Sequence, residues 1–235
     1  MINYHLAIPR ARRRRLRDAH TTRDALLAAG TALFAERGYE GTRVSAVAAR
    51  AGVNPALISY YFGGKRRLYR AIVTAAFADI VARAEALPVA DRPAPEALRE
   101  LIALVAETAT RRNPHFPAMM LREVLTGAKH LGSDTLAYPL RVAGVVRRIV
   151  ERGVREGSFR EVDPWLTHLS VVGSLLFFFA TERLRARMRA ERRLPGRAPG
   201  APEYVTHIQE LFIHGLAAPA GSRALIRGPR GGRAR

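Results

Sequence analysis

Residues 42–64 read TRVSAVAARAGVNPALISYYFGG, and this stretch decides the fold. It predicts two short helices joined by a tight turn at Gly52, because glycine readily adopts the left-handed backbone that ends a helix. Thr42 is expected to cap the first helix and Asn54 the second, where a proline takes the first helical position. Small alanines near the turn allow the two helices to approach closely. The stretch therefore predicts a helix-turn-helix, whose second helix can enter the major groove of DNA.

A plain hairpin of two helices, common in helical proteins, is the alternative interpretation of the same stretch. Two neighbouring features favour DNA binding. The aromatic cluster 60–62 ends the second helix, and the basic run 65–67 begins the next one. Tyrosine hydroxyls and a lysine at a helix N-terminus are suited to contact phosphate oxygens.

The charge of the chain also indicates a polyanionic partner. Its 235 residues include 39 lysines and arginines against 20 acidic residues, a formal net charge of +19. The basic excess lies in residues 1–70, 181–200 and 219–235, whereas residues 71–180 are nearly balanced. Cysteine is absent, which excludes disulfides, thiolate nucleophiles and cysteine–zinc sites. A nonspecific protein that coats DNA or binds RNA remains the alternative to a sequence-specific one.

Helical periodicity continues outside this stretch and strand patterns are scarce, so we predict an all-α fold. The most apolar run, residues 166–180, is too short to cross a bilayer, and the chain is expected in the cytoplasm. The other expected helices span residues 21–38, 65–87, 96–112, 117–128, 135–156, 164–192 and 203–218. The expected divisions are a basic, disordered arm (1–20), a helix-turn-helix domain (21–70), a helical body (71–218) and an Arg/Gly-rich, disordered tail (219–235).

Residues 26–71 closely resemble the DNA-binding domain of the TetR/AcrR family of bacterial regulators. The resemblance extends over about 50 residues without a gap. Its ordered landmarks are Phe34, Gly38, Tyr39, Thr42, Val47, Ala48, Gly52, Val53, Ile58, Phe62, Lys65 and Leu68. The C-terminal half resembles a CerR-type branch of the family in its helix pattern. The resemblance implies a homodimeric repressor that binds palindromic operator DNA through residues 21–70 and a small-molecule effector in the helical body 71–218.

The resemblance also implies individual contacts with DNA. Thr42 and Arg43 would contact phosphates, while Tyr61 and Lys65 would hold the backbone. Base edges or thymine methyl groups would face Pro55, Ala56, Leu57 and Tyr60. Ile58 and Phe62 would belong to the core. Ser59 and Tyr61 depart from the residues usual in the family, so the operator sequence cannot be taken from a relative.

The helical body is expected to hold an apolar, adaptable pocket, because methionine and aromatic side chains suit one. Each candidate could also be a plain core residue. The pocket candidates are Met119, Met120, Glu123, Trp165, His168 and Phe178. The helix 164–192 is apolar on more than one side, which favours burial against a second copy. The dimer candidates on this helix and the last one are Leu169, Val172, Leu176, Ile208, Leu211 and Phe212.

One group of polar residues needs a separate interpretation. His207, Glu210 and His214 share a helical face, but a metal site needs further ligands and supporting hydrogen bonds, so we predict no metal. Nor does the chain contain a GxSxG, P-loop or GxGxxG motif, and its histidines are scattered. We therefore expect neither an enzyme nor a cofactor.

Overall fold

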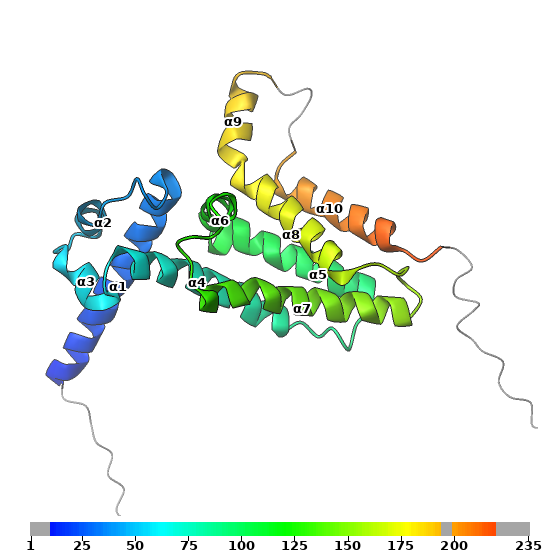
Figure 1. The fold of residues 1–235 in the computed structure, drawn as a ribbon, viewed down its shortest axis with the longest axis horizontal. Helices are drawn as coiled ribbons and strands as arrows, with labels where there is room; N and C mark the ends of the chain where they lie inside the picture. The colour runs from blue at the N-terminus through cyan, green and yellow to red at the C-terminus, as the bar shows by residue number, and fades with distance from the viewer. Residues whose placement is uncertain (1–9, 194–198, 220–235) are drawn as a thin grey trace, which may run out of the picture. The chain divides into compact units, whose positions relative to one another are not determined.

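The computed structural model describes residues 10–193 and 199–219, with side chains from His20 onward. Within these ranges it contains ten α-helices, one π-helical turn and no strand, which confirms the all-α prediction (Figure 1). The chain divides into two compact units between Ala75 and Ala76, inside α4 (Lys65–Glu85). The first unit holds α1 (Arg10–Arg37), α2 (Val44–Ala51), α3 (Ala56–Phe62) and the start of α4. The second holds the rest of α4, α5 (Ala94–Glu107), η1 (Thr108–Arg112), α6 (Phe116–Leu125), α7 (Ser133–Arg155), α8 (Pro164–Ala180), α9 (Glu182–Ala190) and α10 (Ala201–Leu216).

Helix α1 begins at Arg10, well before the start expected near Thr21. Its N-terminal residues are mainly arginine, alanine and leucine, which favour helix, and neither glycine nor proline interrupts them. The expectation of a disordered arm is therefore wrong for residues 10–20. Residues 1–9 and the tail 220–235 lie outside the described residues.

The first unit is built around the inner face of α1. Phe34 lies against the ring of Tyr69 on α4, with ring centroids 4.9 Å apart. Gly30 brings the two helices close together, since a Cβ atom there would lie 2.9 Å from Cδ1 of Ile72. The buried apolar residues of this unit come from all four helices and include Leu26, Leu33, Phe34, Val47, Ile58, Phe62 and Leu68.

Thr42 does not cap α2, so this part of the sequence prediction is wrong. Arg43 precedes the helix instead and makes no side-chain cap. The Thr42 side chain is 1% exposed, and its hydroxyl donates to the carbonyl oxygens of Gly38 at 2.8 Å and Leu33 at 3.1 Å. Thr42 therefore ties the loop to the C-terminal end of α1.

The turn between α2 and α3 follows the sequence prediction. Gly52 adopts the left-handed conformation with φ of 68°, and the amide of Val53 donates to Ala48 at 3.0 Å. Asn54 Oδ1 accepts a hydrogen bond from the Ala56 amide at 2.8 Å. This bond satisfies a free donor at the start of α3, as a capping side chain does.

In the second unit α5 packs against α7, α8 and α10 around one apolar core. Buried residues of this core recur along α5 and α7 every three to four positions, among them Leu98, Leu101, Ile102, Val145 and Ile149. After α7, Phe159 pairs with Ala217 in an isolated bridge, and Arg160 donates to the Leu216 carbonyl at 2.9 Å. These bonds hold the end of α10 to the segment before α8.

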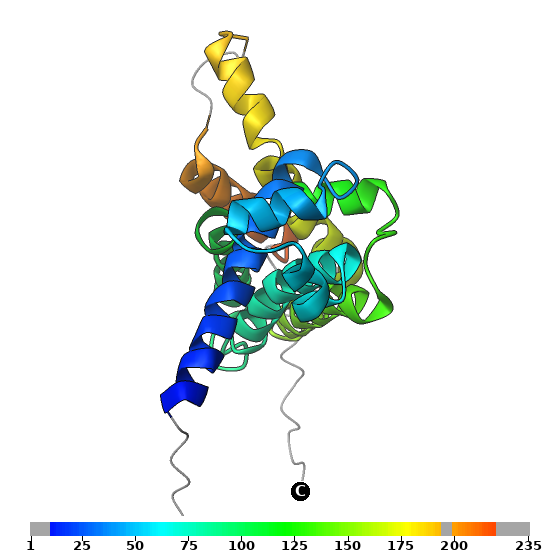
Figure 2. The ribbon, with the colours of Figure 1, turned by 90° about the vertical axis from the view of Figure 1, so that its left-hand side faces the viewer.

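The expected helix 164–192 is two helices, α8 and α9, with a bend of 50° between them. The Thr181 hydroxyl donates to the Phe177 carbonyl at 2.7 Å, and the Arg185 guanidinium donates to the Phe178 carbonyl. Such side-chain bonds compete with backbone bonds and bend helices. Helix α9 consequently turns away from the rest of its unit (Figure 2). Among the described residues no single helix is long and apolar enough to cross a membrane, although α8 and α9 pass that test as a bent pair.

Candidate DNA-binding surface and apolar cavity

Helix α3 separates its residues into a core side and an exposed side. Ile58 is fully buried and Phe62 is 8% exposed, which confirms both as core residues. Tyr60 is 79% exposed, so its ring is accessible on the outer side of the helix. Among the other contact candidates, Pro55, Ala56 and Ser59 are exposed, and Leu57 and Tyr61 are half-buried.

Basic residues flank this exposed side of the first unit. Arg43 is exposed just before α2. Lys65, the first residue of α4, is half-buried, and its ammonium lies 4.3 Å from the centroid of the Tyr39 ring. The ring orients the lysine by a cation–π contact without neutralising its charge. Thr42 is not accessible for a contact with DNA, because it is buried and its hydroxyl and its amide both donate hydrogen bonds within the unit.

The second unit contains an apolar cavity of about 350 Å³ between α4, α5, η1, α6, α7 and α8. This volume is within the range of small-molecule sites. Three of the six sequence-predicted pocket residues line it: Met120, Trp165 and His168. Trp165 and His168 stack on one another with ring centroids 5.4 Å apart.

The other three pocket candidates do not line this cavity. Met119, 2% exposed, is a core residue. Glu123 is buried with one carboxylate oxygen 2.8 Å from Nδ1 of His130. Phe178 stacks on Tyr204 of α10 with centroids 3.7 Å apart. Residues one position apart on a helix point in different directions, and the sequence does not say which direction leads to the cavity.

The cavity takes much of its wall from residues that sequence analysis assigned to the dimer or did not single out. Leu169, Val172 and Leu176 were expected at the dimer interface but line the cavity. Ile208, also a dimer candidate, is 3% exposed and belongs to the core of its own chain. Leu211 is 55% exposed and Phe212 is half-buried. Many wall residues on other helices were not singled out from the sequence, because single apolar residues give no signal of a cavity; among them are Phe77, Ile80, Phe116 and Val142.

Among the described residues, three side chains with a polar atom line the cavity: Thr108, Trp165 through its indole N–H, and His168. Thr108 donates to the Leu104 carbonyl at 3.1 Å and accepts from Arg83 at 3.3 Å. Burial lowers the pKa of the His168 imidazole below its usual value of 6.5, because the charged form is poorly solvated there. His168 is therefore neutral at pH 7 and the cavity carries no ionised wall.

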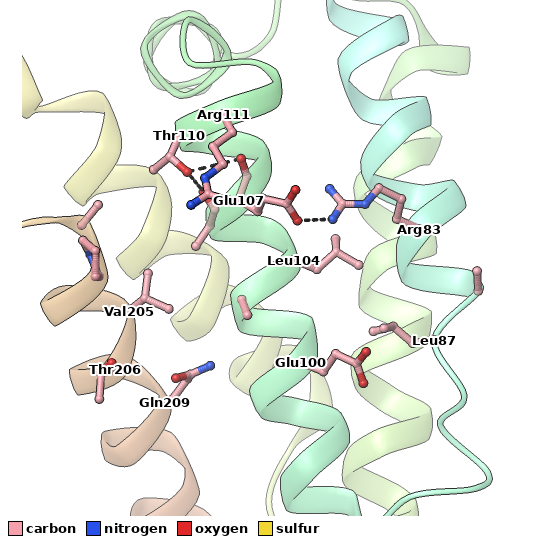
Figure 3. A pocket seen from close by; sticks show the side chains of 15 residues that line it. Arg83, Leu87, Glu100, Leu104, Glu107, Thr110, Arg111, Val205, Thr206 and Gln209 are labelled. Atoms are coloured by element: carbon pink, nitrogen blue, oxygen red, sulfur yellow. Dashed lines mark hydrogen bonds and ion pairs between the residues drawn. The ribbon is translucent and has the colours of Figure 1, made fainter.

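A wider groove of about 980 Å³ lies on the same unit between α4, α5, η1 and α10. Figure 3 shows Arg83 of α4 and Glu107 of α5 directed at one another in an ion pair, with Val205 and Gln209 on the facing side of α10. This groove has charged walls, among them Glu100 and Arg111, and so differs in chemistry from the cavity.

The polar face of α10 is engaged in contacts within the chain. Glu210 pairs with Arg99 of α5, and that hydrogen bond lowers the pKa of its carboxyl. His214 lies 3.4 Å from the same carboxylate. Among the residues that the structure describes, no group of three or more histidine and acidic side chains could hold a metal ion.

A helix-turn-helix unit joined to a helical body with an apolar cavity is typical of one class of protein, the DNA-binding regulators. Residues 26–72 match the family described as "Bacterial regulatory proteins, tetR family", and residues 95–198 match "Tetracyclin repressor-like, C-terminal domain". The chain belongs to the TetR family and is a DNA-binding transcriptional regulator. The finer resemblance of the C-terminal half to a CerR-type branch stays a prediction.

Relatives of the whole chain are also transcriptional regulators. The HTH-type transcriptional repressor NicS of Pseudomonas putida is 31% identical over 206 residues, which cover 86% of this chain and 95% of NicS. The HTH-type transcriptional regulator RutR of Escherichia coli is 26% identical over 151 residues, covering 64% of this chain and 70% of RutR. The crystal structure of the TetR family regulator PfmR from Thermus thermophilus superposes with a TM-score of 0.65 at 29% identity, covering 80% of this chain and 97% of PfmR.

Proposed function

We propose that this regulator is a homodimeric repressor of the bacterial cytoplasm that leaves its palindromic operator when a small molecule occupies the apolar cavity. The single observation that carries the proposal is the cavity itself, about 350 Å³ of apolar space inside the unit that does not hold the helix-turn-helix. Well-packed interiors contain few voids larger than a water molecule. A void of this size lined by aromatic and aliphatic side chains is the usual form of a ligand site.

The proposed DNA contacts follow the exposed side of α3 and its basic neighbours. Tyr60, Ser59, Ala56 and Pro55 are free to meet base edges, because none of them is buried in the first unit. Few of these side chains offer hydrogen bonds, so specificity would rest on thymine methyl contacts and on DNA shape. Arg43, Tyr61 and Lys65 would hold the phosphates.

Helix α4 supplies the proposed connection between ligand and DNA. Its first residue, Lys65, is a proposed phosphate contact, and its later residues Phe77 and Ile80 line the cavity. A ligand that displaces Phe77 or Ile80 would shift α4 and with it the separation of the two recognition helices in a dimer. Those helices must lie about one turn of DNA apart, roughly 34–36 Å, to contact both half-sites.

A second copy would pack on exposed apolar residues of α8 and α10. Leu166, Phe177 and Leu211 are each more than half exposed in the single chain. Two-fold dimers are the commonest assemblies and match the two-fold symmetry of a palindromic operator.

A footprint on the DNA beside the gene, followed by titrations, tests the proposal. A discrete palindromic footprint is expected; uniform coating would instead support the nonspecific nucleic-acid-binding alternative. An effector found in a metabolite and drug panel should weaken operator binding about 5- to 150-fold, which corresponds to a coupling of 1–3 kcal/mol. Linkage requires the operator to weaken effector binding by the same factor. A bound effector that leaves operator affinity unchanged would refute the release mechanism.

A further inference from the structure

We infer that the cavity takes an uncharged aromatic molecule with a single hydrogen-bonding group, and that His168 binds this group. The inference rests on the proposed function, since it names the chemistry of the molecule that would occupy the proposed effector site. The wall residues that determine the chemistry of the ligand come from six elements of the second unit.

The absence of charge on the wall argues against an ionised ligand. None of the lining residues is an aspartate, glutamate, lysine or arginine, although the chain as a whole carries a net charge of +19. Arg83 reaches the wall only through its bond to Thr108, and its charge is paired with Glu107. A buried carboxylate or ammonium without a partner is strongly disfavoured. A neutral ligand is therefore favoured.

Aromatic rings from three elements, α4, α6 and α8, line the cavity, and they favour an aromatic ligand. Phe77 and Phe116 pack edge to face with centroids 4.9 Å apart, and Trp165 stacks on His168. Phe179 completes the set from the end of α8. Rings prefer offset-stacked or edge-to-face partners, which gives an aromatic ligand an advantage over an aliphatic chain of the same area.

His168 provides the polar contact. Its side chain is 4% exposed, and Nδ1 is buried with no hydrogen-bond partner in the described part of the chain. A buried polar atom left without a partner is costly, and such groups in native proteins commonly mark a function. Thr108 cannot serve in the same way, because its hydroxyl already donates to Leu104 and accepts from Arg83. A neutral imidazole can donate to or accept from one hydroxyl or carbonyl group of a ligand.

Three probes that share a butylphenyl group test the inference on the full-length protein: 4-butylphenol, butylbenzene and 4-butylbenzoate. Trp165 is the only tryptophan of the chain and lines the cavity, so its fluorescence reports occupancy directly. We expect 4-butylphenol to bind about 3- to 10-fold more tightly than butylbenzene, the factor that one hydrogen bond contributes. We expect 4-butylbenzoate to bind at least about 10-fold more weakly than the phenol, because its charge is not compensated. Tightest binding by the benzoate, or no binding by any probe, would overturn the inference.

Two variants assign the polar contact. His168→Phe should bind butylbenzene as the native protein does and lose the preference for the phenol, whereas His168→Gln should keep part of it because an amide can still donate or accept. An unchanged preference in His168→Phe would show that another group binds the hydroxyl. If His168→Phe does not fold, a reduced preference in His168→Gln would support the assignment and an unchanged preference would reject it.

The same titrations separate this inference from the proposed function. Phenol binding that changes Trp165 fluorescence but not operator affinity would keep the ligand class and reject the release mechanism. A charged effector that changes Trp165 fluorescence and releases the operator would keep the release mechanism and reject the ligand class.

Discussion

Lys65 is the residue whose proposed contact with DNA is simplest to test. It is one of only two lysines, and it stands at the first position of a helix with its ammonium over the Tyr39 ring. If it binds a phosphate in each half-site, Lys65→Ala should weaken all DNA sequences about equally. The slope of log affinity against log salt should fall by about one unit for each phosphate that the variant no longer binds. Filter binding or fluorescence anisotropy across a salt series measures both quantities.

Lys129→Ala is the matched control for this prediction, because Lys129 is the other lysine and lies in the second unit. It should leave the slope unchanged. A Lys65→Ala variant that folds normally and keeps the native slope would remove Lys65 from the DNA contacts.

His168 should make the stability of the protein depend on pH. Its pKa is lowered in the folded chain by burial, so the unfolded chain binds a proton first as the pH falls below 6.5. The free energy of unfolding should therefore fall from pH 6.5 down to the lowered pKa, and be flat in this contribution below it. Thermal unfolding at pH 7.5 and 5.5 should show a smaller decrease for His168→Gln than for the native chain. Equal decreases would contradict the prediction, and His207→Gln, at an exposed position, is the control.

The residue scale also shows where sequence reasoning succeeds and where it stops. The family resemblance correctly placed Ile58 in the core and Tyr60 outside it, and both lie on one regular helix. The prediction from local sequence that Thr42 caps the next helix failed. Its role depends on a loop that folds back onto α1, nine residues earlier in the chain, and local spacing contains no information on that contact.

On α7, two glycines nine residues apart have opposite roles. A Cβ atom on Gly153 would lie less than 3.0 Å from three carbon atoms of the buried Phe159 ring, whereas one on Gly144 would meet nothing within 4 Å. Gly153→Ala should therefore destabilise the second unit by about 1–3 kcal/mol through overpacking. Gly144→Ala should stabilise it by up to about 1 kcal/mol, because alanine favours helix. Denaturant unfolding measures both, and equal effects of the two substitutions would show that Phe159 can move aside.

The break between α8 and α9 was beyond prediction for a related reason. Every residue from 164 to 192 except the first tolerates helix, and the apolar run ends without glycine or proline. The bend arises from bonds that Thr181 and Arg185 make with carbonyl groups of the preceding turn. Arg185 also lies over the Phe178 ring at 3.6 Å, and Phe178 stacks on Tyr204. The side-chain bonds at the break and the tertiary stacking on α10 together favour the bent form, and neither is visible in the helical periodicity of the sequence.

At the scale of the whole molecule, the family and the class of fold could be predicted from residues 26–71 alone. Which side of α8 faces the core, which the cavity and which the solvent could not be predicted from the sequence. The sequence shows that the helix is apolar on several sides, yet one side faces the core, one the cavity and one the solvent, through Val171, Val172 and Phe177 respectively. All three residues are apolar, and only the packing of neighbouring helices separates their roles.

The exposed side of α8 should therefore be the one that a second copy covers. Phe177 is 63% exposed and Leu211 on α10 is 55% exposed, so glutamate at either position costs little in a single chain. In a dimer the carboxylate would be buried without a partner, at a cost of several kcal/mol. Phe177→Glu and Leu211→Glu should each give folded monomers by light scattering. They should also lose operator affinity, because one chain contacts only one half-site.

Leu176→Glu is the control for this prediction. The Leu176 side chain lines the cavity, so glutamate there should impair ligand binding and leave the dimer intact. If both exposed-side variants remained dimeric with native unfolding curves, the interface would have to lie on another surface, and the apolar exposure of α8 and α10 would need a different partner.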